Sequence, residues 1–182
     1  MNEYKPTKQE LADSVNNTIH DVIDYNLKVL FCGINPGLYT AATGFHFARP
    51  GNRFWPALYK SGFTKELLKP YDQEKLLEYK YGITNFVSRT TNAAAELNRK
   101  EYELGAKILT EKVLKYKPEY LVVLGIGAYK AGFNRKQAKI GLQDHKIGDT
   151  KIWILPNPSG LNANFTPTDL ARLFGELREA VN

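Results

Sequence analysis

The feature that most constrains this chain is an apolar segment that stops at a loop rich in glycine and proline. Residues 28–32, KVLFC, have the composition of a short buried strand. The strand has to end at residues 33–37, GINPG, because two glycines and a proline forbid its continuation. Polar Asn35 is therefore placed on a tight loop. Ligands of α/β sheets bind at loops beyond the carboxyl ends of strands, so this loop is a candidate active site.

A second segment near the other end of the sequence has the same design. Residues 151–155, KIWIL, are strand-like and lead into residues 156–162, PNPSGLN. If both segments are parallel strands of one sheet, their loops open at the same edge. Asn35 and the tip at Ser159-Gly160-Leu161 would then surround one cleft.

Strand-like and helical segments alternate along the rest of the chain. Thr7 and Glu10 form a capping-box pattern that opens a short helix to about residue 16, and apolar residues at helical spacing predict further helices at 52–61, 65–80, 100–117 and 168–181. In the same way, Trp55 is predicted to belong to the core. Residues 128–133 are expected to form a short helical turn, and 133–149 a polar connection.

Further strands are predicted at residues 82–87 and 120–124, the second buried on both faces. We therefore expect a three-layer α/β/α sandwich around a mainly parallel sheet of about four strands. One domain is expected over residues 1–182, with residues 1–26 as a helical extension packed on it.

Composition restricts the function further. With 25 Lys and Arg against 19 Asp and Glu, the formal charge of +6 permits nucleic-acid binding without requiring it. No apolar run is long enough for a membrane span, and the first residues lack the apolar core of a signal peptide, so we expect a cytoplasmic protein. Nothing indicates oligomerisation, and we expect a monomer.

Cofactor chemistry finds little support in the sequence. Cys32 is the single cysteine and lies inside a predicted strand, so it is expected to be a buried, unreactive thiol. Three scattered histidines have no metal-ligand spacing, and no metal is expected. Gly125-Ile126-Gly127 suggests a dinucleotide loop, but the third glycine of that motif would fall at Lys130. We expect no cofactor.

Together, residues 33–37, residues 44–55 (GFHFARPGNRFW) and residues 157–161 (NPSGL) resemble the mismatch-specific uracil/thymine DNA glycosylases, a branch of the uracil-DNA glycosylase superfamily. The resemblance extends from about residue 24 to residue 181. It implies a DNA repair enzyme that flips uracil, with thymine as a further candidate, out of G:U or G:T mispairs and hydrolyses its glycosidic bond. The implied partner is double-stranded DNA with a mispaired or damaged base. The resemblance is to bacterial-type enzymes, which act in the cytoplasm at the nucleoid.

Asn35 is the predicted catalytic residue. Its amide has no useful basicity and can only orient the attacking water, which costs about 10²–10⁴ in rate relative to a general base. The reaction remains possible because the base can depart before water is strongly committed. The prediction is a slow, monofunctional glycosylase that leaves an abasic site. A mere turn-forming role for Asn35 is the alternative.

The resemblance also assigns the base pocket. Phe47 is expected to stack on the extruded base, and Ile34 to offer backbone groups to it. Thr84 and Asn85 are expected to line the pocket, with Thr40 contributing to its polarity. Asn157 stands where a more active branch carries His in a His-Pro-Ser motif, which again predicts slow turnover.

The second loop is expected to contact DNA. Leu161 has the apolar bulk to fill the gap left by an extruded base, and Gly160 would let the backbone approach the orphaned partner. Ser159 would hold a phosphate. Asn162 follows Leu161 where some relatives have Arg, which affects opposite-base preference. The alternative for Leu161 is packing onto the core.

Two other functions are compatible with the sequence. The same cleft could admit deaminated purines or etheno adducts. Because position 35 carries neither an acid nor a base, the chain could also be a non-catalytic mispair-binding protein.

Overall fold

The computed structural model describes residues 4–182, and its centre is a five-stranded sheet with the order β2-β1-β3-β5-β4. The strands are β1 (Val29–Gly33), β2 (Tyr81–Asn85), β3 (Tyr120–Leu124), β4 (Gly141–Ile147) and β5 (Thr150–Leu155). Only β4 runs antiparallel, paired with β5; the other neighbours are parallel. The predicted α/β fold class is confirmed, with one strand more than expected.

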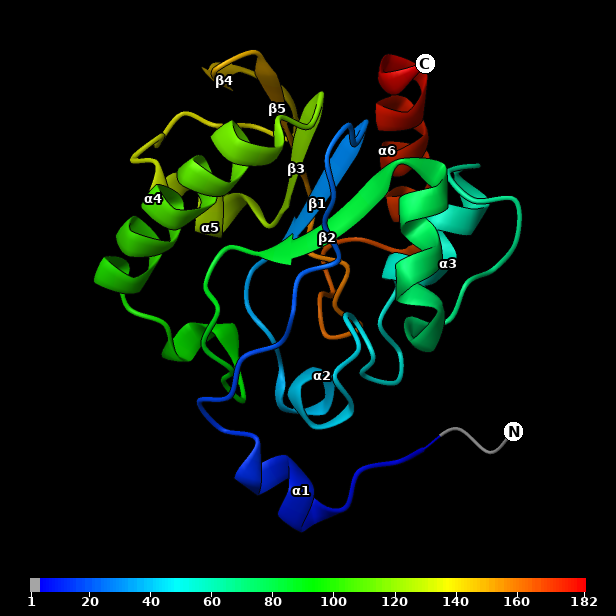
Figure 1. Cartoon of the computed structure of the whole chain (residues 1–182), viewed down its shortest axis with the longest axis vertical. Coiled ribbons are helices and arrows are strands. Elements are labelled where there is room, and N and C mark those ends of the chain that lie inside the picture. The colour runs from blue at the N-terminus through cyan, green and yellow to red at the C-terminus, as the bar shows by residue number, and fades with distance from the viewer. Residues whose placement is uncertain (1–3) are drawn as a thin grey trace.

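Helices cover both faces of this sheet. α4 (Arg99–Tyr116) and α5 (Ile126–Gly132) lie on one face, and α3 (Phe54–Lys60) and α6 (Pro167–Val181) on the other (Figure 1). The shorter elements are α1 (Lys8–Asp13), α2 (Leu38–Thr43) and two 3₁₀ helices, η1 (Pro70–Tyr79) and η2 (Ala94–Glu96). In Figure 1, α2 lies below the sheet and α1 lies below α2.

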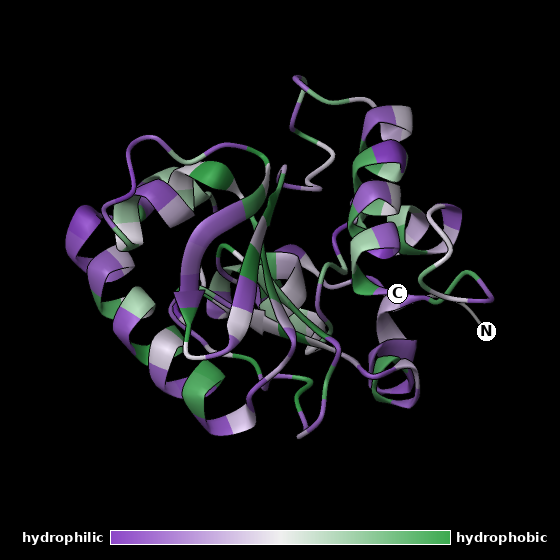
Figure 2. Ribbon diagram, turned by 90° about the horizontal axis from the view of Figure 1, so that it is seen from above, coloured by the Kyte–Doolittle hydropathy of each residue, from purple (hydrophilic) through white to green (hydrophobic). Residues whose placement is uncertain are grey.

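Strand alternation divides the buried side chains into two cores. Phe31 and Val122 pack on the side of α3 and α6, whereas Leu30, Cys32 and Leu121 pack on the side of α4 and α5. The middle strands are accordingly mostly hydrophobic, while the outer helices carry hydrophilic stretches (Figure 2). Cys32 is fully buried as predicted, and burial raises the pKa of its thiol.

Three segments differ from expectation. The connection predicted at 133–149 contains β4, whose inward residues include Gln143 and His145, so no apolar alternation marks it. Residues 65–80 form η1 from Pro70 onward rather than an α-helix. The short α2 was not predicted; its N-cap Gly37 makes no side-chain cap bond and it lacks an apolar stripe. The helix that starts at the Thr7–Glu10 capping box is confirmed.

The sheet order places a topological switch point at β1. From β1 the chain moves to β2 on one side and later returns to β3 on the other. A crevice opens at the carboxyl ends of strands where the order reverses in this way. β1 and β5 are not neighbours, because β3 lies between them, so the loops after β1 and β5 have to reach across the end of β3 to meet. No helix among residues 4–182 is long and apolar enough to cross a membrane.

Candidate active site

A cavity of about 210 Å³ opens at this edge of the sheet, with both predicted loops in its wall. The predicted residues that line it are Ile34, Asn35, Thr40, Phe47, Asn85, Asn157, Ser159 and Leu161. Gly160 and Asn162 belong to the same loop without lining the cavity. The structure thus brings together the two motifs, which are more than one hundred residues apart in sequence.

The side chain of Asn35 is fixed in one orientation. Its Nδ2 donates to the carbonyl oxygen of Arg89 at 2.9 Å, to Oγ1 of Thr91 at 2.8 Å and more weakly to the carbonyl of Pro36 at 3.3 Å. Backbone carbonyls can only accept, so the nitrogen has to face them and the amide cannot be flipped. Oδ1 has no hydrogen-bond donor among residues 4–182 and remains available to a water or substrate in the cavity.

Two anchored residues hold this amide. The guanidinium of Arg89 forms a two-pronged ion pair with Glu101 at the start of α4, at 2.7 and 3.2 Å. The Thr91 hydroxyl is buried and donates in turn to the carbonyl oxygen of Ala93 at 2.9 Å. Asn35 is therefore positioned by the first turn of α4, a relationship that sequence reasoning missed because nothing local links residues 35, 91 and 101.

Phe47 forms one wall of the cavity under backbone strain. Its φ of +54° is unusual for a bulky residue, and such outliers concentrate at functional sites. The ring stacks on Phe54 with centroids 4.1 Å apart. At Gly33, an added Cβ would lie 2.8 Å from Oδ1 of Asn85 and 3.3 Å from the Phe47 ring. The glycine at the end of β1 therefore lets both side chains close over the strand.

Thr84 does not line the cavity, contrary to expectation. It is fully buried, accepts a hydrogen bond from Lys112 Nζ of α4 at 2.7 Å and donates to Asp21 at 2.7 Å. In the parallel register it lies beside Cys32, on the face covered by α4. Asn85, one residue later, points to the other side and reaches the cavity.

The second loop is folded by its own side chains. Oδ1 of Asn157 accepts the N–H of Ser159 at 3.0 Å, which fixes the amide and leaves Nδ2 without an acceptor among residues 4–182. The Ser159 hydroxyl accepts the N–H of Leu161 at 3.2 Å and keeps its own proton to donate. Leu161 is 73% exposed, so the alternative in which it packs on the core is wrong.

Arg53 locks this loop against the first motif, a role not foreseen from the sequence. Its guanidinium donates to the carbonyl oxygens of Gly160 at 3.1 Å, Asn162 at 3.1 Å and Phe165 at 2.6 Å. At Gly160, an added Cβ would lie 2.4 Å from the carbonyl oxygen of Gly51, so the two loops approach each other through a glycine backbone. The exposed Leu161 is thereby carried on a rigid support.

His46 is a further wall residue, and no sequence signal singled it out. It is 1% exposed, and its Nε2 lies 2.9 Å from the carbonyl oxygen of His20, so Nε2 carries a proton. Burial lowers the pKa of His46 and favours the neutral ring. The indole N–H of Trp55, which lies in the core as predicted, donates to the His46 carbonyl oxygen at 3.1 Å.

The electrostatics of the cavity are simple. Arg49 is the one charged residue in its lining, and no Asp or Glu lies there among residues 4–182. Over the same residues, no three His, Cys, Asp or Glu side chains gather as a metal site would require. The wall can therefore orient, donate and accept hydrogen bonds, but it holds no carboxylate to remove a proton from water.

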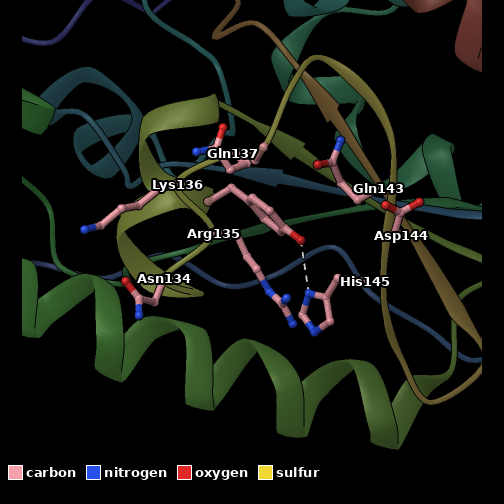
Figure 3. A pocket seen from close by; sticks show the side chains of 9 residues that line it. Asn134, Arg135, Lys136, Gln137, Gln143, Asp144 and His145 are labelled. Carbon is pink, nitrogen blue, oxygen red and sulfur yellow. Dashed lines mark hydrogen bonds between the residues drawn. The ribbon is translucent and has the colours of Figure 1, made fainter.

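A separate cavity of about 570 Å³ lies between α5, the loop after it and β4 (Figure 3). There the Tyr129 hydroxyl and His145 Nδ1 are 3.0 Å apart, and burial together with Arg135 lowers the pKa of His145. None of the predicted site residues lines it. We interpret the Tyr129–His145 contact as a structural link between α5 and the edge strand.

Residues 20–178 match the model described as the uracil DNA glycosylase superfamily. The match includes every residue that lines the 210 Å³ cavity.

Proposed function

The chain belongs to the uracil DNA glycosylase superfamily, and from this premise we propose that it excises uracil, and also thymine, from mispairs with guanine. Members of the superfamily are DNA glycosylases, hydrolases that bind DNA and cleave the bond between base and sugar. The proposal concerns the substrate and the mechanism: a monofunctional reaction that leaves an abasic site.

The orientation of Asn35 is the observation that supports this mechanism best. Its amide nitrogen is engaged by protein acceptors and Oδ1 faces no protein donor, so Oδ1 can accept a hydrogen from the attacking water and aim the water's lone pair at the sugar. An amide cannot take the proton away. We therefore propose that the base departs first as an anion, through an oxocarbenium-like state, and that the positioned water then adds to the sugar and gives its proton to the departed base.

The departing base becomes negatively charged and needs donors. Nδ2 of Asn157 is free to donate from the second loop, and the Asn85 amide can offer a donor and an acceptor to the edge of a pyrimidine. Preorganised donors aimed at developing charge are usually the largest contribution to such catalysis. Neutral donors stabilise the anion less than a cation does, so we expect slow turnover.

Cavity size suits a single nucleobase. The 210 Å³ space is smaller than the range of about 300–1,000 Å³ typical of sites for drug-sized ligands. A pyrimidine stacked on Phe47 is the proposed occupant, and a deaminated purine or an etheno adduct is the alternative. Screening these bases opposite guanine separates the two classes of substrate.

Leu161 is proposed to fill the gap in the duplex after base flipping. It is exposed at the loop tip that Arg53 holds, and extrusion costs a few kcal/mol that an apolar wedge offsets. Leu161→Ala should slow excision from duplex DNA more than from single strands. Equal losses on both substrates would exclude the wedge.

The mechanism is tested with Asn35→Ala. We expect loss of excision, while a duplex containing uracil is bound with nearly unchanged affinity because the base, phosphate and wedge contacts remain. Full activity of the variant would rule out a water-orienting role and leave Asn35 as a turn former.

A further inference from the structure

A second, larger cavity adjoins the active-site cavity. It has a volume of about 770 Å³ and shares Phe47, Arg49 and Asn52 with the wall of the smaller one. Its far side is formed by the start of η1 and the residues before it, including Leu67, Lys69 and Tyr71. The two cavities therefore adjoin, with these three residues between them.

Aromatic side chains dominate its lining. Tyr4, Tyr39, Phe45, Phe47, Trp55 and Tyr71 contribute to it. Tyr71 is 57% exposed and Phe45 is 36% exposed, although both are large rings next to a cavity. Exposed rings of this kind offer flat faces to a planar partner.

The charge of the lining has one sign. Arg49 and Lys69 belong to it, and none of its members among residues 4–182 is Asp or Glu. Neither cation has an ion-pair partner in the described part of the chain. The nearby Asp72 is occupied, because it pairs with Lys75 and accepts the backbone N–H of Lys69.

We propose that this cavity binds nucleotides of single-stranded DNA that adjoin the nucleotide whose base enters the active site. The inference rests on the proposed function and extends it to single-stranded DNA as a ligand. Stacking platforms combined with cations that follow a backbone are the general means of binding single strands. The shared wall residues place the two cavities side by side, so nucleotides next to one held in the 210 Å³ cavity lie near Arg49.

The test is binding of a fluorescein-labelled single-stranded oligothymidine without uracil, followed by anisotropy. Tyr71→Ala should raise Kd about five-fold or more, as expected for losing one base–aromatic stack. Tyr71→Phe keeps the ring and should bind like the parent. Tyr59→Ala is the matched control, because Tyr59 is 46% exposed on α3 but lies outside the cavity lining.

The cations give an independent readout. Lys69→Gln should lower the slope of log Kd against log salt by about 0.7, the value for one phosphate contact on a single strand. Lys60→Gln, on α3 and outside the lining, should leave the slope unchanged. Each variant is first checked for an unchanged melting temperature.

The outcomes separate the two proposals. Excision from a G:U duplex by Tyr71→Ala should stay within about two-fold of the parent, because the neighbouring bases remain paired there. If the parent protein excises no base, the proposed function fails while the binding assay still decides this inference. Equal Kd values for Tyr71→Ala and Tyr59→Ala, or a change in self-association instead of DNA binding, would overturn it.

Discussion

Replacing Thr91 with valine tests whether the Asn35 amide is positioned by its partners. The change removes the acceptor that lies 2.8 Å from Nδ2 and leaves that N–H only the weaker contact to the Pro36 carbonyl oxygen at 3.3 Å. An unsatisfied buried donor costs about 1–3 kcal/mol. If the cost falls on the transition state, the single-turnover rate constant drops about 5- to 150-fold.

Thr90 provides the matched control for this experiment. Its hydroxyl is equally buried but has no hydrogen-bond partner in the described chain, so Thr90→Val should neither slow the reaction nor lower stability. Thr91→Ser restores the oxygen and should recover activity to within about three-fold of the parent. Rates are measured on a G:U duplex with enzyme in excess, and binding is measured on a duplex with a non-hydrolysable 2′-fluoro nucleotide.

A Thr91→Ser variant as slow as Thr91→Val would contradict a positioning role for the Thr91 oxygen. Equal losses in Thr90→Val and Thr91→Val would do the same, because they would indicate a packing effect without any role for the hydrogen bond. A large loss of binding in Thr91→Val would place its effect on DNA recognition instead of on water.

Three further predictions concern other parts of the site. Arg53→Lys cannot reach three carbonyl oxygens with one ammonium group, so duplex excision should fall about tenfold in single-turnover assays while the fold persists by circular dichroism. Gly33→Ala should displace the Asn85 amide and slow uracil excision while affinity for a duplex with an abasic site is retained. Burial lowers the pKa of His46, so the stability conferred by its neutral form is present above the ordinary pKa of about 6.5 and is lost as pH falls. The urea midpoint of the parent should therefore drop more between pH 7.5 and 5.0 than that of His46→Gln, and equal drops would contradict this assignment.

The position of the candidate site residues could be predicted from the sequence where its signals were local. Proline and glycine end β1 and β5 at Asn35 and Asn157, and parallel strands bring such ends to one edge of the sheet. Leu161 followed from its position at a glycine-rich loop tip.

Long-range contacts could not be predicted in this way. Arg53 reaches Phe165 across 112 residues, and Thr91 meets Asn35 across 56. Neither Arg53 nor Thr91 is an unusual residue type at its position, and only the folded chain shows which groups they contact. Thr84 was misplaced for a related reason: the parallel register puts it on the α4 face, where Lys112 and Asp21 take up its hydroxyl.

β4 shows a different limit. This edge strand lacks the usual alternation, because Leu142 is on its exposed face and Gln143 and His145 are on its inward face. Its pairing with β5 depends on the hairpin and not on an apolar pattern. The fifth strand could therefore not be predicted from hydrophobic periodicity.

Excision of uracil and thymine from mispairs is tested by a single-turnover incubation, in EDTA, of duplexes with G:U, G:T and A:U pairs, followed by alkaline cleavage of abasic sites. We expect metal-independent cleavage that is faster at G:U than at A:U, weaker cleavage at G:T, and no cleavage with Asn35→Ala. Cleavage of A:U as fast as G:U would contradict the mispair preference, and no cleavage of any duplex would contradict the proposed excision of uracil and thymine.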